Sequence, residues 1–269
     1  MFGISVLVRG VKCLAIEVFS RVEKKYVISN DKFLLLKDAM KDHMVKDKYN
    51  RDDKPYHITN IYYDTIDDYL IRNSTDKPYY KEKLRLRGYG VPKSDDMVYL
   101  EIKKKCGSVT YKRRSALHLY EAYEFVKSPD VILKEHVNKQ VLAELNYFIN
   151  TYKPVAKMKV SYDRFAFFSN SANDLRVSFD TNIRTDTKDL LLENENKGNP
   201  ILKEDLWVME IKTSEAIPMW LTKFLSENAI YPTGFSKYGT GHKKEISEKK
   251  GEGLCLVSHR EPLLAKSLR

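Results

Sequence analysis

Positively charged side chains occupy every second position in the stretch KEKLRLRGYG, residues 81–90. The four cations are Lys81, Lys83, Arg85 and Arg87. Successive side chains of an extended chain point to opposite faces, so these four share one face of a strand and the two leucines between them lie on the other. Neighbouring charges about 7 Å apart repel each other by about 2 kcal/mol at an effective dielectric constant of about 20. We therefore expect an anionic group opposite this face.

Six further segments repeat this alternation of a charged face and an apolar face. Their polar faces carry Arg21, Glu23 and Lys25; Tyr99, Glu101, Lys103 and Lys105; Lys112 and Arg114; Tyr162 and Arg164; Arg176, Asp180 and Arg184; and Glu210 and Lys212. A single amphipathic strand with a solvated cationic face is ordinary. Because seven segments share the pattern, we infer that their cations serve one common surface.

The composition limits the class of protein and of partner. The chain has 269 residues and a formal net charge of +10. This length favours a single domain with a well-developed core. The excess of cations favours nucleic acid, an anionic membrane surface or phosphorylated small molecules as partners. Three cysteines, Cys13, Cys106 and Cys255, lack the spacing of a zinc site or a disulfide framework, which indicates a reducing compartment.

Residues 1–18 form an apolar stretch that charged residues interrupt. The stretch is too short and too charged to span a bilayer, and it has no convincing cleavage site for export. We interpret it as an N-terminal extension, either an amphipathic helix or an extra strand. We expect residues 19–244 to form the folded domain and residues 245–269 a polar, mobile tail. The protein is expected to be cytoplasmic or peripheral at the inner face of the membrane.

Three segments have apolar residues at helical spacing. The helices are expected over residues 29–47, 128–152 and 218–228. Ser29 or Asn30 would cap the first helix, and Ser128 would cap the second. Residues 185–200 are expected to form a long hairpin or loop.

The strands between these helices predict an α+β fold with a closed antiparallel β-barrel and helices packed outside. Closure removes exposed strand edges and places alternate residues inside. If the cations line the interior, the apolar faces contact the helices outside and a charged tunnel results. A dry tunnel of Lys and Arg would be unstable, so we expect it to contain water and a polyanion.

The motifs RVEKKY, KLRLRGYG, YLEIKKK, YKRR, YDRFAF, FDTNIR, MEIKT and FSKY follow one another from about Phe19 to Tyr238. In this order they resemble the VTC domain of polyphosphate polymerases, a branch of the triphosphate tunnel metalloenzymes in the CYTH-like superfamily. The resemblance implies a triphosphate tunnel fold whose basic interior binds a triphosphate and a growing polyphosphate chain. It also implies Mn²⁺ or Mg²⁺ as cofactor. The implied enzyme transfers the γ-phosphate of a nucleoside triphosphate, expected to be ATP, to inorganic polyphosphate.

The resemblance and the charged faces together imply the site residues. The implied catalytic residues are Arg85, Arg87, Lys103, Arg164 and Glu210. The implied phosphate-binding residues are Lys25, Lys83, Arg85, Arg87, Lys103, Lys112, Arg114, Arg164, Arg176, Arg184, Lys212 and Lys237. The implied metal ligands are Glu210 and Glu23. Glu101 and Asp180 are equally candidates for the metal and for ion pairs with neighbouring cations. A nucleotide base could stack on Tyr26 or Tyr89.

Two departures from the family pattern affect the expected function. Related tunnel triphosphatases begin with an ExExK strand, but Arg21 stands at the position of the first Glu. The loss of one acid favours phosphate binding over hydrolysis at two metals. Gly234 stands where fungal members carry a second lysine before FSKY, so one phosphate contact at the tunnel end is lost.

Three other functions are alternatives. The same tunnel could hydrolyse a triphosphate, or it could bind polyphosphate without catalysis, although the retention of Glu210 argues against the second. A nucleic-acid binder would also suit the charge, but a tunnel too narrow for bases should prefer bare polyphosphate. Any coupling of synthesis to transport would require a separate membrane protein.

Overall fold

The computed structural model describes residues 22–76, 78–107, 109–130, 138–170, 174–195 and 197–251. The strands of this part of the chain are β1 (Val22–Ser29), β2 (Met44–Lys46), β3 (Tyr56–Asp64), β4 (Tyr80–Tyr89), β5 (Met97–Cys106), β6 (Val109–His118), β7 (Val155–Ser169), β8 (Arg176–Asp186), β9 (Asn199–Pro200) and β10 (Leu206–Thr213). The helices are α1 (Asn30–Ala39), α2 (Tyr69–Thr75), α3 (Leu119–Lys127), α4 (Lys139–Tyr152), α5 (Met219–Glu227) and α6 (Lys237–Lys249), with the short 3₁₀ helix η1 (Arg51–Asp53). None of these helices is long and apolar enough to cross a membrane.

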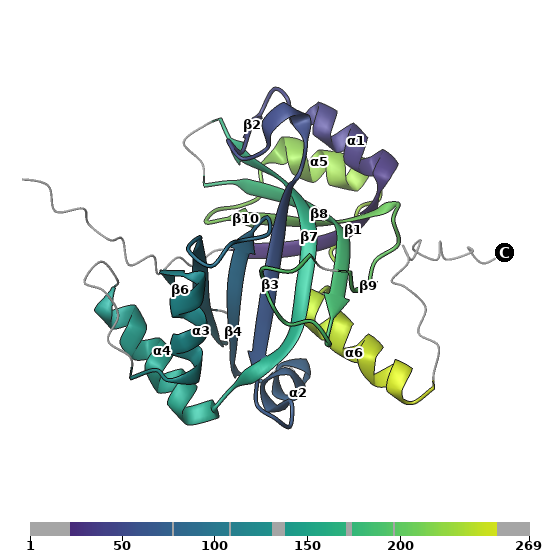
Figure 1. The fold of residues 1–269 in the computed structure, drawn as a ribbon. Coiled ribbons are helices and arrows are strands. Elements are labelled where there is room, and N and C mark those ends of the chain that lie inside the picture. The colour runs from purple at the N-terminus through teal and green to yellow at the C-terminus, as the bar shows by residue number, and fades with distance from the viewer. Residues whose placement is uncertain are drawn as a thin grey trace, which may run out of the picture.

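All the strands that the structure describes join one antiparallel sheet. Its main path has the order β1-β10-β8-β7-β3-β4-β5-β6, while β2 pairs with β7 and β9 pairs with β8. The predicted closed barrel is not confirmed, because β1 and β6 are the two ends of this path and share no ladder. The antiparallel α+β architecture with helices on the sheet is confirmed (Figure 1).

Two apolar clusters place helices on the outer face of the sheet. One joins α3 and α4 to β4, β5 and β6, and it includes Leu84, Leu86 and Ile102. The other joins α1 and α5 to β1, β10, β8 and β7. The leucines of KEKLRLRGYG therefore face helices, and the cations between them face the opposite side of the sheet. We call that opposite side the basic face.

The helix boundaries differ from the predicted ones in two places. The first helix ends at Ala39, and Met44 begins β2. The predicted second helix is wrong at its start, because Ser128 ends α3 and α4 begins only at Lys139, where the Asn138 side chain caps it. The third helix, α5, agrees with the prediction.

α6 is an element that the sequence pattern did not predict. It extends to Lys249, so the first residues of the expected C-terminal tail, 245–249, belong to a helix. The expected extension over residues 1–18 lies outside the described residues, as does the chain beyond Gly251. α6 packs on the basic face, where a Cβ atom at Gly241 would lie 2.7 Å from Met158 Sδ and from Thr185 Cγ2. Only a glycine lets the helix approach this closely.

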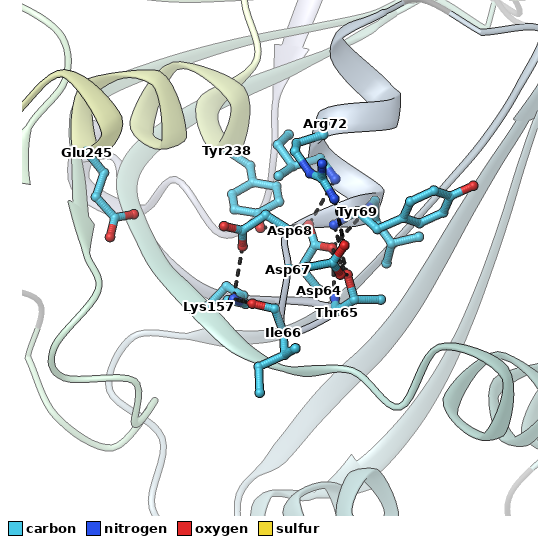
Figure 2. Close-up of polar contacts among 12 residues, drawn as sticks. Asp64, Thr65, Ile66, Asp67, Asp68, Tyr69, Arg72, Lys157, Tyr238 and Glu245 are labelled. Atoms are coloured by element: carbon cyan, nitrogen blue, oxygen red, sulfur yellow. Dashed lines mark hydrogen bonds and ion pairs between the residues drawn. The ribbon is translucent and has the colours of Figure 1, made fainter. Parts of the chain in front are cut away.

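A third apolar cluster fills the basic face where α2 and α6 meet the sheet. It includes Tyr62, Met158, Val160 and Tyr238. Asp64, which is fully buried, accepts hydrogen bonds from the backbone nitrogens of Leu70 and Ile71, at 2.8 and 2.9 Å, and from the Tyr238 hydroxyl at 3.0 Å (Figure 2). This carboxylate therefore ties both helices to the end of β3.

Candidate functional site

The first group of charges on the basic face surrounds Glu101 of β5. One carboxylate oxygen lies 2.6 Å from Arg85 Nε, and the other lies 2.6 Å from Lys112 Nζ. Arg87 Nε is 3.8 Å away. Burial alone would raise the pKa of Glu101, but these three cations hold it well below its usual range. Glu101, only 2% exposed, is therefore an ion-pair partner that keeps neighbouring cations together.

The second group surrounds Asp180 of β8. Arg164 Nε and Nη2 donate to its two oxygens at 2.6 and 2.8 Å, and Lys237 of α6 donates to one of them. Although burial opposes the charged form, the two cations lower the pKa of Asp180 to about 2. Asp180 is thus an anchor for Arg164, and it fixes the first residue of α6 against the sheet.

The third group joins β1, β10 and β5. Lys212 Nζ lies 2.7 Å from Glu210 Oε1, and Lys25 Nζ lies 3.1 Å from Glu23 Oε1. Lys103 Nζ is 3.4 Å from the other oxygen of Glu23. Burial would raise the pKa of Glu210, but Lys212, Lys25, Arg164 and Lys237 hold it well below its usual range. Glu210 therefore lies within reach of both the second and the third group.

A tyrosine joins the first group to the second, as Glu210 joins the second to the third. Arg87 donates to the Tyr162 hydroxyl at 3.3 Å, and the Lys237 ammonium lies 4.4 Å from the centre of the same ring. Burial would raise the pKa of Tyr162, but Arg87, Arg164 and Lys237 lower it to about 8. Arg85 similarly donates to the Tyr62 hydroxyl at 3.3 Å. The three groups are consequently one cationic surface.

Lys83 of β4 adds a further positive charge to this surface. Burial, together with the ammonium groups of Lys81, Lys103 and Lys25, lowers the pKa of Lys83 to about 8. Lys103 Nζ of β5 lies 3.4 Å from Glu23 of β1, so these two strands approach each other although they are not neighbours in the sheet. The face is curved, and its positive charge exceeds what its carboxylates balance.

Three predicted phosphate-binding residues have contacts outside these groups, although Arg114 is opposite Glu101 and Arg176 is opposite Lys212 in the sheet. The Arg114 guanidinium is 4.9 Å from the centre of the Tyr99 ring, and Arg176 lies 3.7 Å from Asp47. Arg184 does not belong to the basic face. The sheet register shifts near Asn182, whose φ of 48° is left-handed, and after this bulge Ile183 packs on the basic face.

The two tyrosines considered for base stacking have different environments. Tyr26 is 2% exposed and packs in the outer cluster with α1, so the expectation for this residue is wrong. Tyr89 is 46% exposed and remains a candidate.

Asn60 of β3, which is fully buried, is a site residue that the charged faces of the strands did not predict. Its Oδ1 accepts a hydrogen bond from Arg87 Nε at 3.0 Å, and its Nδ2 donates to the Val160 carbonyl. Asn60 thus orients the guanidinium of Arg87. A lone asparagine inside the mostly apolar run ITNIYY was the signal that could have indicated this role.

The carboxylates that could bind a divalent metal, Glu210 and Glu23, already form ion pairs with lysines. Among the described residues, no group of three or more His, Cys, Asp or Glu side chains is arranged to hold a metal ion. Glu210 and Glu23 come from neighbouring strands, in which Lys25 is opposite Glu210 and Glu23 is opposite Lys212. Two such carboxylates fit Mg²⁺ or Mn²⁺ when substrate phosphates and water complete the coordination.

Comparisons with solved structures find distant similarity. A Hippeastrum protein described as having a dominant triphosphatase activity is 15% identical, with a TM-score of 0.46 over 89% of this chain and 100% of its own. A protein from Pyrococcus horikoshii is 13% identical, with a TM-score of 0.42 over 85% of this chain and 99% of its own. A search of curated proteins finds no match. Residues 20–246 match the VTC domain, and the chain therefore belongs to the VTC domain family.

Proposed function

We propose that this protein is a polyphosphate polymerase that uses a nucleoside triphosphate, ATP in the first place, as phosphoryl donor. One observation carries the proposal: cations from β1, β4, β5, β6, β7, β10 and α6 converge on one curved face in a member of the VTC domain family. A linear phosphoanhydride would supply the negative charge that this face lacks. Membership in the family and this charge distribution both support a linear phosphoanhydride as substrate.

The transfer that we propose is an in-line displacement at phosphorus. A terminal oxygen of the acceptor polyphosphate forms a bond to the γ-phosphorus of the donor. The bond from that phosphorus to the β–γ bridging oxygen breaks, and the nucleoside diphosphate leaves. Because the acceptor oxygen is already ionised at neutral pH, no general base is required, and the protein must position the phosphates and balance their charge.

The residues on the basic face suit this task in different ways. Arg85, Arg87 and Arg164 have planar guanidinium groups that can each donate two hydrogen bonds to phosphate oxygens. Lys25 and Lys103 supply point charges from two strands that face each other. Glu101, Asp180 and Asn60 hold the guanidinium groups in place before substrate binds.

A metal would be held by Glu210 together with Glu23. When bound, Mn²⁺ or Mg²⁺ would neutralise charge on the phosphate oxygens of the donor. We also propose that residues 19–244 form the catalytic domain and that coupling to a membrane, if the cell uses it, requires a separate protein.

The test is product analysis after incubation of the purified protein with ATP and Mn²⁺. Formation of long, acid-labile phosphate chains together with ADP would support the polymerase. Release of free phosphate without chains would instead identify a triphosphatase, and polyphosphate binding without turnover would identify a binding module. Arg87→Ala is the negative control for each product.

A further inference from the structure

An open pocket with aromatic walls lies at the end of the basic face where β2 pairs with β7. Its volume is about 440 Å³, within the range of small-molecule sites. The lining residues are Lys46, Asp47, Lys48, Tyr49, Tyr56, Tyr89, Phe168 and Arg176. Four aromatic rings and three cations with a single acid are an unusual lining for a site that binds phosphate alone. The rings indicate a ligand that also has a flat apolar part.

Three tyrosine rings of this pocket form a cluster. The ring centres of Tyr49 and Tyr89 are 6.5 Å apart with an interplanar angle of 20°, and Tyr56 lies 6.2 Å from each. Tyr49 is 59% exposed and Tyr89 is 46% exposed, so part of each ring is open to solvent, and Lys48 Nζ lies 5.2 Å from the centre of the Tyr49 ring. Such faces stack on nucleobases of any kind, because every base has a π-face.

The wall that carries Tyr49 is fixed to the sheet. The buried Asn50 side chain donates to the Arg164 carbonyl at 2.8 Å and accepts from the Ala166 nitrogen at 2.9 Å. The Asp47 nitrogen donates to the Ala166 carbonyl, and its carboxylate accepts from the Tyr49 nitrogen at 3.2 Å. The pocket is therefore preformed, and its wall is hydrogen-bonded to the backbone of Arg164 and Ala166 in β7.

The pocket is continuous with the basic face. Tyr56 is opposite Arg164 in the β3–β7 pairing, so the two side chains lie on the same side of the sheet. Arg176 lies 4.9 Å from the centre of the Phe168 ring and 3.7 Å from Asp47. A ligand with its flat part in the pocket would thus place an anionic tail on Arg176 and Arg164.

We propose that this pocket binds the base and ribose of the nucleoside triphosphate donor, with its phosphates directed onto Arg176 and Arg164. This inference rests on the proposed use of a nucleoside triphosphate. It assigns stacking to Tyr49 and Tyr89 and places the donor at this end of the basic face. Arg176 then contacts the phosphates nearest the ribose.

The experiment is a direct binding titration that needs no turnover. The fluorescent-base analogue ethenoadenosine triphosphate and inorganic tripolyphosphate are each titrated into the full chain and into Tyr89→Ala, Tyr49→Ala and Tyr89→Phe. We expect both alanine variants to bind the analogue about tenfold more weakly and tripolyphosphate as the unchanged protein does. Tyr89→Phe keeps the ring and should bind like the unchanged protein. Tyr147→Ala removes an exposed tyrosine of α4 and is the matched control.

The outcomes separate this proposal from the proposed function. Equal affinity of the alanine variants and the unchanged protein for the analogue would overturn the base pocket, and so would a parallel loss of tripolyphosphate binding. The unchanged protein could meet the binding expectations yet release only free phosphate from ATP. In that case the base pocket would stand and the polymerase would not.

Discussion

The ammonium group of Lys103 lies 3.4 Å from a carboxylate oxygen of Glu23, which connects β5 to the end strand β1. The two strands are not neighbours in the ladder of the described sheet. The contact between β1 and β5 is therefore made by side chains and not by backbone hydrogen bonds. Because both groups are partly exposed, such a pair contributes about 0–1 kcal/mol to folding.

Lys103→Ala tests whether this pair serves binding or the fold. We expect the free energy of unfolding to change by less than about 1 kcal/mol. The affinity for polyphosphate should fall about tenfold, because one charge-assisted hydrogen bond is lost. Denaturant unfolding and titration calorimetry measure the two quantities. Lys223→Ala on α5, where the lysine is exposed, should change neither. A large loss of stability at unchanged affinity would assign Lys103 to the fold.

Glu101→Gln tests the carboxylate at the centre of the first group. The substitution leaves Arg85, Arg87 and Lys112 without their buried counter-charge. We therefore expect the free energy of unfolding to fall by about 3–5 kcal/mol. Polyphosphate should raise the melting temperature of the variant more than that of the unchanged protein, because it replaces the missing charge. Thermal unfolding with and without polyphosphate measures this difference. An equal rise in both proteins would mean that polyphosphate does not contact these cations.

Arg87→Ala and Arg184→Ala form a matched pair, since the sequence pattern assigned both residues to phosphate. Arg87 faces the basic surface and contacts Asn60 and Tyr162. Arg184 instead donates to Asn182 Oδ1 and the Gly198 carbonyl. We expect chain synthesis to be lost in the first variant and kept in the second, as measured by chain length on gels. Comparable activity of the two variants would contradict this assignment of faces.

These residues also show how far the sequence could predict the site. Alternation along a strand is a local rule, so it correctly placed Arg85, Arg87 and Lys103 on one face. The same rule failed at Arg184, because a left-handed Asn182 shifts the register by one residue and moves later side chains to the other face. The pattern contained no signal for that bulge.

The sheet path and α6 depend on contacts between segments far apart in the chain. Whether β1 pairs with β6 is decided by the curvature of the whole sheet, and no strand sequence specifies it. α6 has a weak apolar pattern, and Gly241 stands where the helix touches Met158. An ion pair was one of the two alternatives for Asp180, but the strand pattern did not predict that Arg164 would be its bidentate, buried partner. Arg164→Ala should therefore lower the free energy of unfolding, because it leaves the buried Asp180 without its guanidinium partner. Substitution of a cation that has no buried carboxylate partner should not have this effect.

Glu210→Gln separates a metal ligand from a structural carboxylate. The glutamine keeps the size of the side chain but loses the charge that a divalent cation requires. We expect the variant to lose turnover that depends on Mn²⁺ while still binding polyphosphate, since no phosphate contact is removed. Product analysis across a range of Mn²⁺ concentrations, together with a binding titration, distinguishes the two effects. Loss of polyphosphate binding would show that Glu210 instead orients Lys212 and Lys25.

Lys83 provides a test by pH. Its pKa of about 8 is below the ordinary value of 10.5, so between these two values the unfolded chain holds a proton that the folded protein lacks. The contribution of Lys83 to stability therefore rises with pH in this range. Bound polyphosphate favours the charged ammonium, so binding at about pH 9 must take up this proton, and the affinity should fall by up to about tenfold per pH unit above about pH 8.

Titration calorimetry at about pH 9, in two buffers that differ in ionisation enthalpy, counts the protons taken up. Lys83→Arg stays charged at this pH and should take up about one proton fewer than the unchanged protein. The same polyphosphate is used with both proteins, so the titration of the ligand itself cancels. Equal proton uptake by the two proteins would show that Lys83 is already charged before polyphosphate binds.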